Sequence, residues 1–131
     1  MSSTEVSTPP PKVLTWVGWI LSILPSLMLV MSGVMKFVKP PGFTEGLAKI
    51  GFPESVMNGL GFVELASVLL YLIPQTSVLG AILLTGYLGG ATAAHVRVHD
   101  NFLAPVIIGM VLWLGLYFRD ARIRSLIPFR R

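Results

Sequence analysis

Residues 55–96 read SVMNGLGFVELASVLLYLIPQTSVLGAILLTGYLGGATAAHV and decide the fold. Two apolar runs, residues 55–73 and 77–96, each approach the length of about 20 residues that a helix needs to cross the hydrocarbon core of a membrane. Only three residues, Pro74 to Thr76, lie between them, a connection as short as those of antiparallel helix hairpins. We therefore predict that this stretch forms two adjacent membrane-spanning helices.

Apolar runs of similar character stand on either side of this hairpin. They cover residues 13–35 and 102–118. Between the first run and the hairpin, residues 43–50 carry apolar side chains at i, i+4 and i+7, which is typical of a short amphipathic helix on a membrane surface. The sequence predicts an all-α protein, a transmembrane four-helix up-and-down bundle with a short interfacial helix between spans 1 and 2.

The two ends of the chain are polar. Residues 1–12 are rich in Ser, Thr and Pro, which predicts a disordered tail, and residues 119–131 form a basic tail. Lysine and arginine are enriched in cytoplasmic segments. Lys12 and the five C-terminal arginines give six such residues on the side of the termini, against four on the other side. We expect a multi-pass protein of the cell membrane with both termini in the cytoplasm.

The composition limits what the protein can bind and which chemistry it can perform. Only 12% of its 131 residues are charged and 53% are hydrophobic, whereas soluble domains carry about 25% charged residues. Half of the ten basic residues lie in the C-terminal tail, so no basic surface remains for a nucleic acid. The chain has no cysteine, which excludes disulfides, thiolate nucleophiles and iron–sulfur clusters.

Small residues recur every four positions in the first and third apolar runs, a spacing that lets membrane helices approach closely. We expect these stripes to be contact faces inside one molecule. A homodimer formed through one of them is the alternative. The stripes consist of Gly86, Gly90 and Ala94, of Gly89 and Ala93, and of Gly18, Ser22 and Ser26.

Glu64 is the only charged residue deep in any of the four runs. A carboxylate at that depth costs roughly 3 kcal/mol on insertion scales, so it needs a partner inside the protein. Helical geometry places it on one face with Gly61, Ser67, Val68 and Tyr71, opposite an apolar face for lipid. Two interpretations stay open: Glu64 anchors a functional site, or its hydrogen bond only fixes helix packing.

Further residues are candidates for a polar site around Glu64. Tyr71 lies about two turns along the same helix. Lys36 and Arg97 end the first and third runs on the same side of the membrane, where they either bend toward Glu64 or serve as interfacial anchors. His95 is a possible proton acceptor at membrane depth. A polar stripe in and beyond the third run completes a predicted cavity open to the non-cytoplasmic side, and it consists of Thr85, Gly89, Thr92 and His99.

His95 and His99 stand four residues apart, which on a helix is a metal-ligand spacing. Asp100 or Glu64 would have to supply a third ligand. His99 falls near or beyond the end of the predicted helix, and the pair lacks a helical glutamate partner. We therefore predict no metal site and keep this pair as its only candidate ligands.

Three motifs resemble those of the DoxX-like membrane proteins. They are Leu29 to Phe37 (LVMSGVMKF), Gly61 to Leu65 (GFVEL) with its acidic residue, and Gly90 to Arg97 (GATAAHVR). The resemblance covers roughly residues 22–118 and implies a four-helix bundle in a bacterial cytoplasmic membrane. It implies little biochemistry. The family's founding name comes from a subunit linked to sulfur oxidation and quinone reduction, and other relatives assist redox systems or the assembly of membrane proteins.

Three functions follow as hypotheses. The first is an accessory or assembly subunit of a membrane complex, not a stand-alone enzyme, whose cavity binds a partner helix or a small hydrophobic ligand through Glu64. The second is a quinone-linked redox component, because Glu64, Tyr71 and His95 offer the hydrogen-bonding groups that a quinone headgroup needs. No other cofactor is evident. The third is a small proton-coupled carrier that uses Glu64 as its proton site.

Overall fold

The computed structural model describes residues 12–130, so the predicted N-terminal tail lies, apart from Lys12, outside the described residues. Within this range the chain is helical and contains no strand. The four long helices are α1 (Lys12–Val38), α3 (Met57–Leu72), α4 (Ser77–Arg97) and α5 (Leu103–Arg119). The short elements are α2 (Phe43–Lys49), η1 (Glu54–Val56), η2 (Pro74–Thr76) and α6 (Ala121–Leu126).

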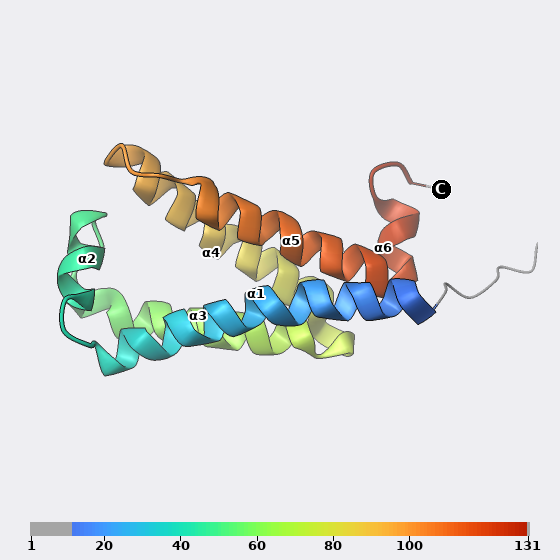
Figure 1. Cartoon of the computed structure of the whole chain (residues 1–131), viewed down its shortest axis with the longest axis horizontal. Helices are drawn as coiled ribbons and strands as arrows, with labels where there is room; N and C mark the ends of the chain where they lie inside the picture. The colour runs from blue at the N-terminus through green and yellow to red at the C-terminus, as the bar shows by residue number, and fades with distance from the viewer. Residues whose placement is uncertain (1–11, 131) are drawn as a thin grey trace, which may run out of the picture.

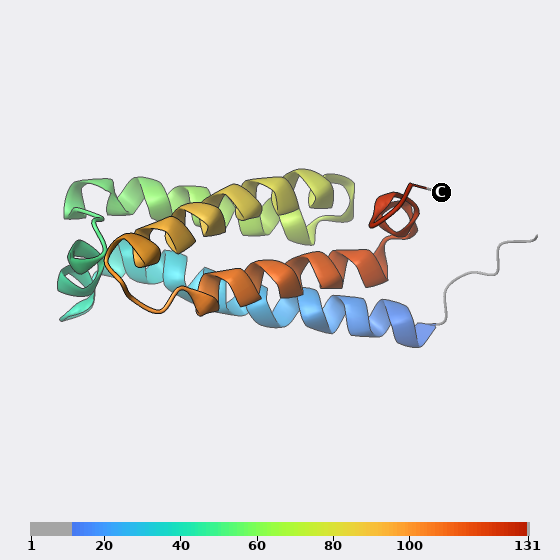
Figure 2. The same ribbon diagram turned by 90° about the horizontal axis from the view of Figure 1, so that it is seen from above.

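The chain reverses direction at each connection between long helices (Figure 1). Seen from above, α1 and α5 lie along one side and α3 and α4 along the other (Figure 2). Each long helix packs against two others, in the cyclic order α1, α3, α4, α5. α2 lies at the end where α1 finishes and α3 begins, and α6 lies at the opposite end (Figure 1).

The outer surface of these helices is apolar. Large side chains such as Trp16, Leu27, Phe62 and Leu69 are exposed. Within residues 12–130, three helical stretches are long and apolar enough to cross a membrane: α1, η1 with α3, and η2 with α4. α5 is a shorter apolar helix of 17 residues. An apolar exterior of this extent needs a lipid environment, because soluble monomers rarely expose large contiguous apolar patches.

α1 and α5 meet through small residues. Gly18, Ser22 and Ser26 are buried, and a Cβ atom placed on Gly18 would lie 2.9 Å from the carbonyl oxygen of Gly115. Only glycine permits this approach, because any side chain would push the two backbones apart. The prediction that this stripe is an internal contact face is confirmed.

The glycine stripes of α4 behave differently. Ala94 is buried, but Gly86, Gly89 and Gly90 have open space where a Cβ atom would be. The prediction that these three glycines are contact faces inside the molecule is therefore wrong. The physical reason is that α4 borders a hollow on either side at this level, and no neighbouring backbone closes against it.

Residues 119–131 are more than a tail, because they contain the short helix α6. Asp120 caps this helix by accepting a hydrogen bond from the backbone N–H of Arg122 at 2.9 Å. Ile123 is buried and belongs to the hydrophobic core. The six-residue helix escaped the sequence analysis because its basic residues dominate the pattern.

A matched pair of glycines on α4 tests this packing. A methyl group on Gly80 would overlap the backbone of Tyr71 on α3, whereas one on Gly86 meets nothing within 4 Å. We expect Gly80→Ala to reduce stability by about 1–3 kcal/mol, as overpacked sites do, and Gly86→Ala to leave it unchanged or raise it by up to about 1 kcal/mol, because alanine has the higher helix propensity. Unfolding in mild detergent measures both, and equal effects of the two substitutions would contradict the packing of α3 on α4.

Candidate functional site

Glu64 is buried in the middle of α3 and is only 1% exposed. The buried residues of this helix include Gly61, Glu64, Ser67, Val68 and Tyr71, which is the inward face that the helical pattern predicts. Phe62 and Leu69 on the opposite face are exposed. The carboxyl group of Glu64 therefore lies among the helices and does not face lipid.

Three side chains from two other helices meet this carboxylate. Lys36 of α1 donates a hydrogen bond from Nζ to Glu64 Oε1 at 2.9 Å and forms a buried ion pair with it. Tyr87 of α4 donates to the same oxygen at 3.0 Å, and Ser32 of α1 at 3.3 Å. Lys36 also donates to Ser32 Oγ at 2.8 Å. These contacts offset the cost of placing a charged carboxylate at membrane depth.

The other carboxylate oxygen faces free space. All the hydrogen bonds that Glu64 accepts fall on Oε1, and Oε2 has no partner among residues 12–130. No fully buried side-chain nitrogen or oxygen in this range lacks a partner. It follows that Oε2 is accessible, and the space it reaches is the cavity that Glu64 lines. This oxygen is an acceptor available to a ligand.

That cavity has a volume of about 510 Å³. Ser32, Lys36, Glu64, Tyr87 and His95 form its polar part. The rest of the wall is mostly apolar and comes from the four long helices, α2 and the turn after α2. It includes Met28, Leu29, Leu47, Ile50, Phe52, Leu60, Leu88 and Ile108. A mostly apolar hollow with a few convergent polar groups is the common form of a small-molecule site.

Three of the predicted site residues lie elsewhere, which corrects the grouping made from sequence. Tyr71 lies about two turns from Glu64 and donates from its hydroxyl to Ser22 Oγ at 3.0 Å. Thr92 donates to Leu88 O at 2.8 Å and lines a separate groove of about 620 Å³ between α4 and α5. Arg97 donates to Ile50 O at 3.1 Å and so holds the turn after α2. Spacing along one helix does not fix which neighbour a side chain meets.

The polar stripe predicted on the third span does not line the Glu64 cavity. Thr85, Gly89 and Thr92 line the groove between α4 and α5, where Thr85 Oγ1 accepts a hydrogen bond from Trp113 Nε1 at 2.7 Å. The remaining wall of this groove is largely apolar. Such a surface suits acyl chains and lacks a charged group.

The two histidines do not share a helix face. His95 lies in α4, lines the Glu64 cavity and contacts Ala91 O through Nδ1 at 2.7 Å. His99 comes after the end of α4 and has a left-handed backbone with φ of 58°. Among the described residues, no group of three or more His, Cys, Asp or Glu side chains is arranged to hold a metal ion.

Sequence reasoning missed Ser32 and Tyr87 as members of this site. Ser32 precedes Lys36 by one helical turn, so its i, i+4 spacing from Lys36 was the signal that could have identified Ser32. Tyr87 is a single polar aromatic residue within a glycine-rich helix that has no clear polar face, and no pattern distinguishes it. Its hydroxyl reaches Glu64 only because α3 and α4 form a tight hairpin.

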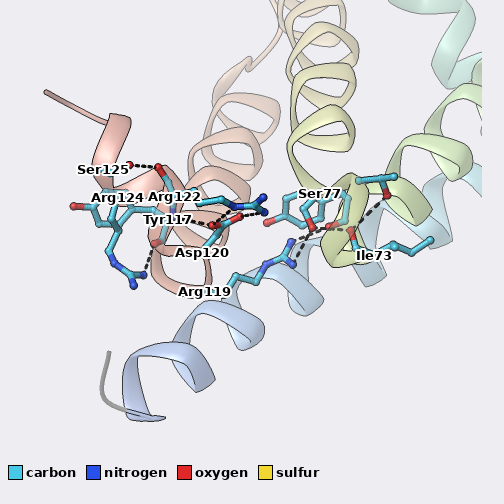
Figure 3. Close-up of polar contacts among 10 residues, drawn as sticks. Ile73, Ser77, Tyr117, Arg119, Asp120, Arg122, Arg124 and Ser125 are labelled. Carbon is cyan, nitrogen blue, oxygen red and sulfur yellow. Dashed lines mark hydrogen bonds and ion pairs between the residues drawn. The ribbon is translucent and has the colours of Figure 1, made fainter. Parts of the chain in front are cut away.

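A second polar cluster lies at the opposite end of the helices and centres on Arg119, the last residue of α5 (Figure 3). Its guanidinium donates to Ser22 Oγ at 2.9 Å, Ser77 Oγ at 3.2 Å and Tyr71 O at 2.8 Å. It also stacks on the rings of Trp19 and Tyr71, at 4.3 and 4.7 Å from their centroids. Arg119 thus ties α5 to α1, α3 and α4, and is not part of a free basic tail.

Asp120 and Arg122 form an ion pair beside this cluster, with 3.1 Å between Asp120 Oδ2 and the Arg122 guanidinium (Figure 3). Burial alone would raise the pKa of Asp120. Hydrogen bonds from the side chain and backbone of Arg122, with the charges of Arg122 and Arg119, outweigh burial and lower this pKa below its usual value. The carboxylate is therefore ionised at neutral pH.

The apolar exterior and the buried ion pair define a small helical membrane protein with a mostly apolar cavity that carries a few polar groups. Comparison with protein families makes this more specific, because the model of the DoxX-like family matches residues 20–115. The chain belongs to the DoxX-like family, and the resemblance drawn from its three motifs is confirmed. Searches of curated proteins and of solved structures gave no match.

The ion pair makes a prediction about coupled stability. Removing one partner leaves the other charge buried alone, so Lys36→Met and Glu64→Gln should each destabilise the protein by roughly 3–5 kcal/mol. The double substitution should cost much less than the sum of the two, since neither charge remains. Unfolding of the four proteins in detergent completes the cycle, and additive effects would show that the two side chains do not interact.

Proposed function

We propose that this DoxX-like protein crosses the cell membrane four times, with both termini in the cytoplasm and α2 at the opposite surface. Support comes from the four long apolar helices of alternating direction (Figure 1). At about 1.5 Å per residue, the 17 residues of α5 extend roughly 25 Å, a little less than the hydrocarbon core. The excess of Lys and Arg near the termini favours this orientation.

We further propose that the protein is an accessory subunit of a membrane complex that holds a small apolar ligand in the Glu64 cavity. One observation carries this proposal: a cavity of about 510 Å³ with a paired carboxylate whose second oxygen is accessible. The volume falls within the range of about 300–1,000 Å³ typical of ligand sites. A half-open hollow of this size suits a small molecule better than a partner helix.

The charges of the cavity indicate the chemistry of that ligand. Lys36 and Glu64 neutralise each other, so the site has no net charge to recruit an ionic ligand. Glu64 Oε2 accepts hydrogen bonds but cannot donate them while ionised. The best fit is a neutral molecule that is apolar over most of its length and donates a hydrogen bond, such as a hydroxyl, at one end.

A quinone-linked redox component is the second candidate. His95 lines the same cavity as Glu64 and Tyr87, so a quinol headgroup would find a carboxylate acceptor and an imidazole ring within one site. A quinol bound here would have to pass its two electrons to a partner protein, and a quinone would have to receive two electrons from one. The proton-coupled carrier draws less support, because the carboxylate it requires is already held in an ion pair.

Two adjacent glycines of α4 provide a test of ligand binding. Gly90 lines the Glu64 cavity and Gly89 lines the groove on the other side, and both have open space for a side chain. We expect Gly90→Leu to fill the cavity and reduce the amount of co-purifying ligand at least tenfold, while Gly89→Leu retains it. Extraction and mass spectrometry of protein purified in mild detergent measures the bound molecule.

Further variants separate the ligand from the partner. Glu64→Gln should also lose the ligand, and a quinone or quinol in the wild-type extract would select the redox role. Affinity purification from membranes should recover a second membrane protein. Equal ligand content in the two glycine variants would exclude this cavity as the site, and recovery of the chain alone would argue against the accessory role.

A further inference from the structure

The guanidinium of Arg119 is a positive charge without a carboxylate partner. Its three hydrogen bonds go to two serine hydroxyls and a backbone carbonyl, all neutral groups. Within residues 12–130 the ion pairs are Lys36 with Glu64 and Arg122 with Asp120, and neither includes Arg119. A guanidinium has five N–H donors, so two remain beyond the three used here. This charge and these donors can bind an anion.

A hollow of about 220 Å³ lies directly against this guanidinium. Arg119 and Arg122 supply its donors, since the Ser77 hydroxyl already donates to Ile73 O, and Asp120 is the one carboxylate in its wall. Since Asp120 is already paired with Arg122, the wall keeps a net charge of +1. Figure 3 shows the Arg119 side chain reaching from the end of α5 toward Ser77 at the start of α4. Arginine forks match the geometry of phosphate oxygens.

The surroundings of the hollow are those of a membrane surface. Trp19, which stacks on Arg119, also lines the hollow, and tryptophan is enriched at the level of lipid headgroups. Leu126 and Phe129, which end and follow α6, are exposed, Phe129 to 79%. The groove between α4 and α5 reaches α6 as well, through Tyr117 and Ile123. Apolar surface for acyl chains therefore lies at the same end as the basic hollow.

We propose that this hollow binds the phosphate group of an anionic phospholipid, and that Arg119 and Arg122 are its ligands. The lipid phosphate would form an ion pair with Arg119, which has none within residues 12–130, at the end of the bundle that carries the C-terminal arginines. This site is separate from the Glu64 cavity, which lies toward the other end of α3. The inference does not depend on the ligand proposed for that cavity.

Three charge variants test the proposal without disturbing Arg119, which the fold itself requires. Arg122→Gln removes one phosphate ligand. Asp120→Asn keeps an oxygen to cap α6 but frees Arg122 and removes the competing negative charge. Lys39→Gln is the control, because it removes one positive charge at the opposite end, where Lys39 bonds Asn58. Each protein is reconstituted in nanodiscs with equal phosphatidylglycerol and phosphatidylcholine, and the retained lipids are counted by native mass spectrometry.

We expect the wild type to retain phosphatidylglycerol in preference to phosphatidylcholine. Arg122→Gln should lower that preference roughly fivefold and Asp120→Asn should raise it roughly fivefold, the effect of about 1 kcal/mol per charge at a membrane surface. Lys39→Gln should leave it unchanged. Equal retention of both lipids by the wild type, or equal losses in Arg122→Gln and Lys39→Gln, would overturn the proposal. The proposal would also be overturned if millimolar inorganic phosphate stabilised the lipid-free protein and displaced phosphatidylglycerol, because the site would then bind free phosphate.

Discussion

A carboxylate buried in an apolar helix has to find its partners inside the protein, because a bilayer offers it no water. The arrangement around Glu64 follows from this constraint. Lys36 neutralises its charge, and Ser32 and Tyr87 supply further hydrogen bonds. These groups come from α1 and α4, so the contacts of a single side chain join three helices. The ion pair is therefore a point of assembly as well as the polar end of a cavity.

The Arg119 cluster applies the same constraint at the other end of the bundle. Tyr71 lies on the same face of α3 as Glu64 and bonds Ser22 of α1, while Glu64 bonds Ser32 and Lys36 of that helix. Two polar clusters thus fix the register of α1 against α3. One is centred on a negatively charged carboxylate and the other on a positively charged guanidinium. Between them the helices pack through small and apolar side chains, which have little directional preference.

Several of these features could be predicted from sequence because each depends on the chain locally. Run length and the short connection at Pro74 indicate the hairpin of α3 and α4, and helical periodicity places Glu64 on the buried face of α3. The partners of Glu64 depend on the height and rotation of other helices, which no spacing along α3 encodes. Tyr71 was therefore assigned to the wrong cluster and Tyr87 was overlooked. Arg119 was hidden for another reason: nothing in the sequence distinguishes it, among the C-terminal arginines, as a residue that bonds α1 and α3.

The glycines of α4 that have open space beside them affect the shape of the two voids that this helix borders. Gly90 borders the ion-paired cavity and Gly89 borders the groove on the other side, so one thin stretch of backbone separates two voids. Each void exists partly because glycine has no side chain to fill it. Alanine, serine or valine at either position would remodel one compartment while every helix stays where it is. Under the proposed function, a single substitution at Gly89 or Gly90 would therefore change which ligand fits while the scaffold stays the same.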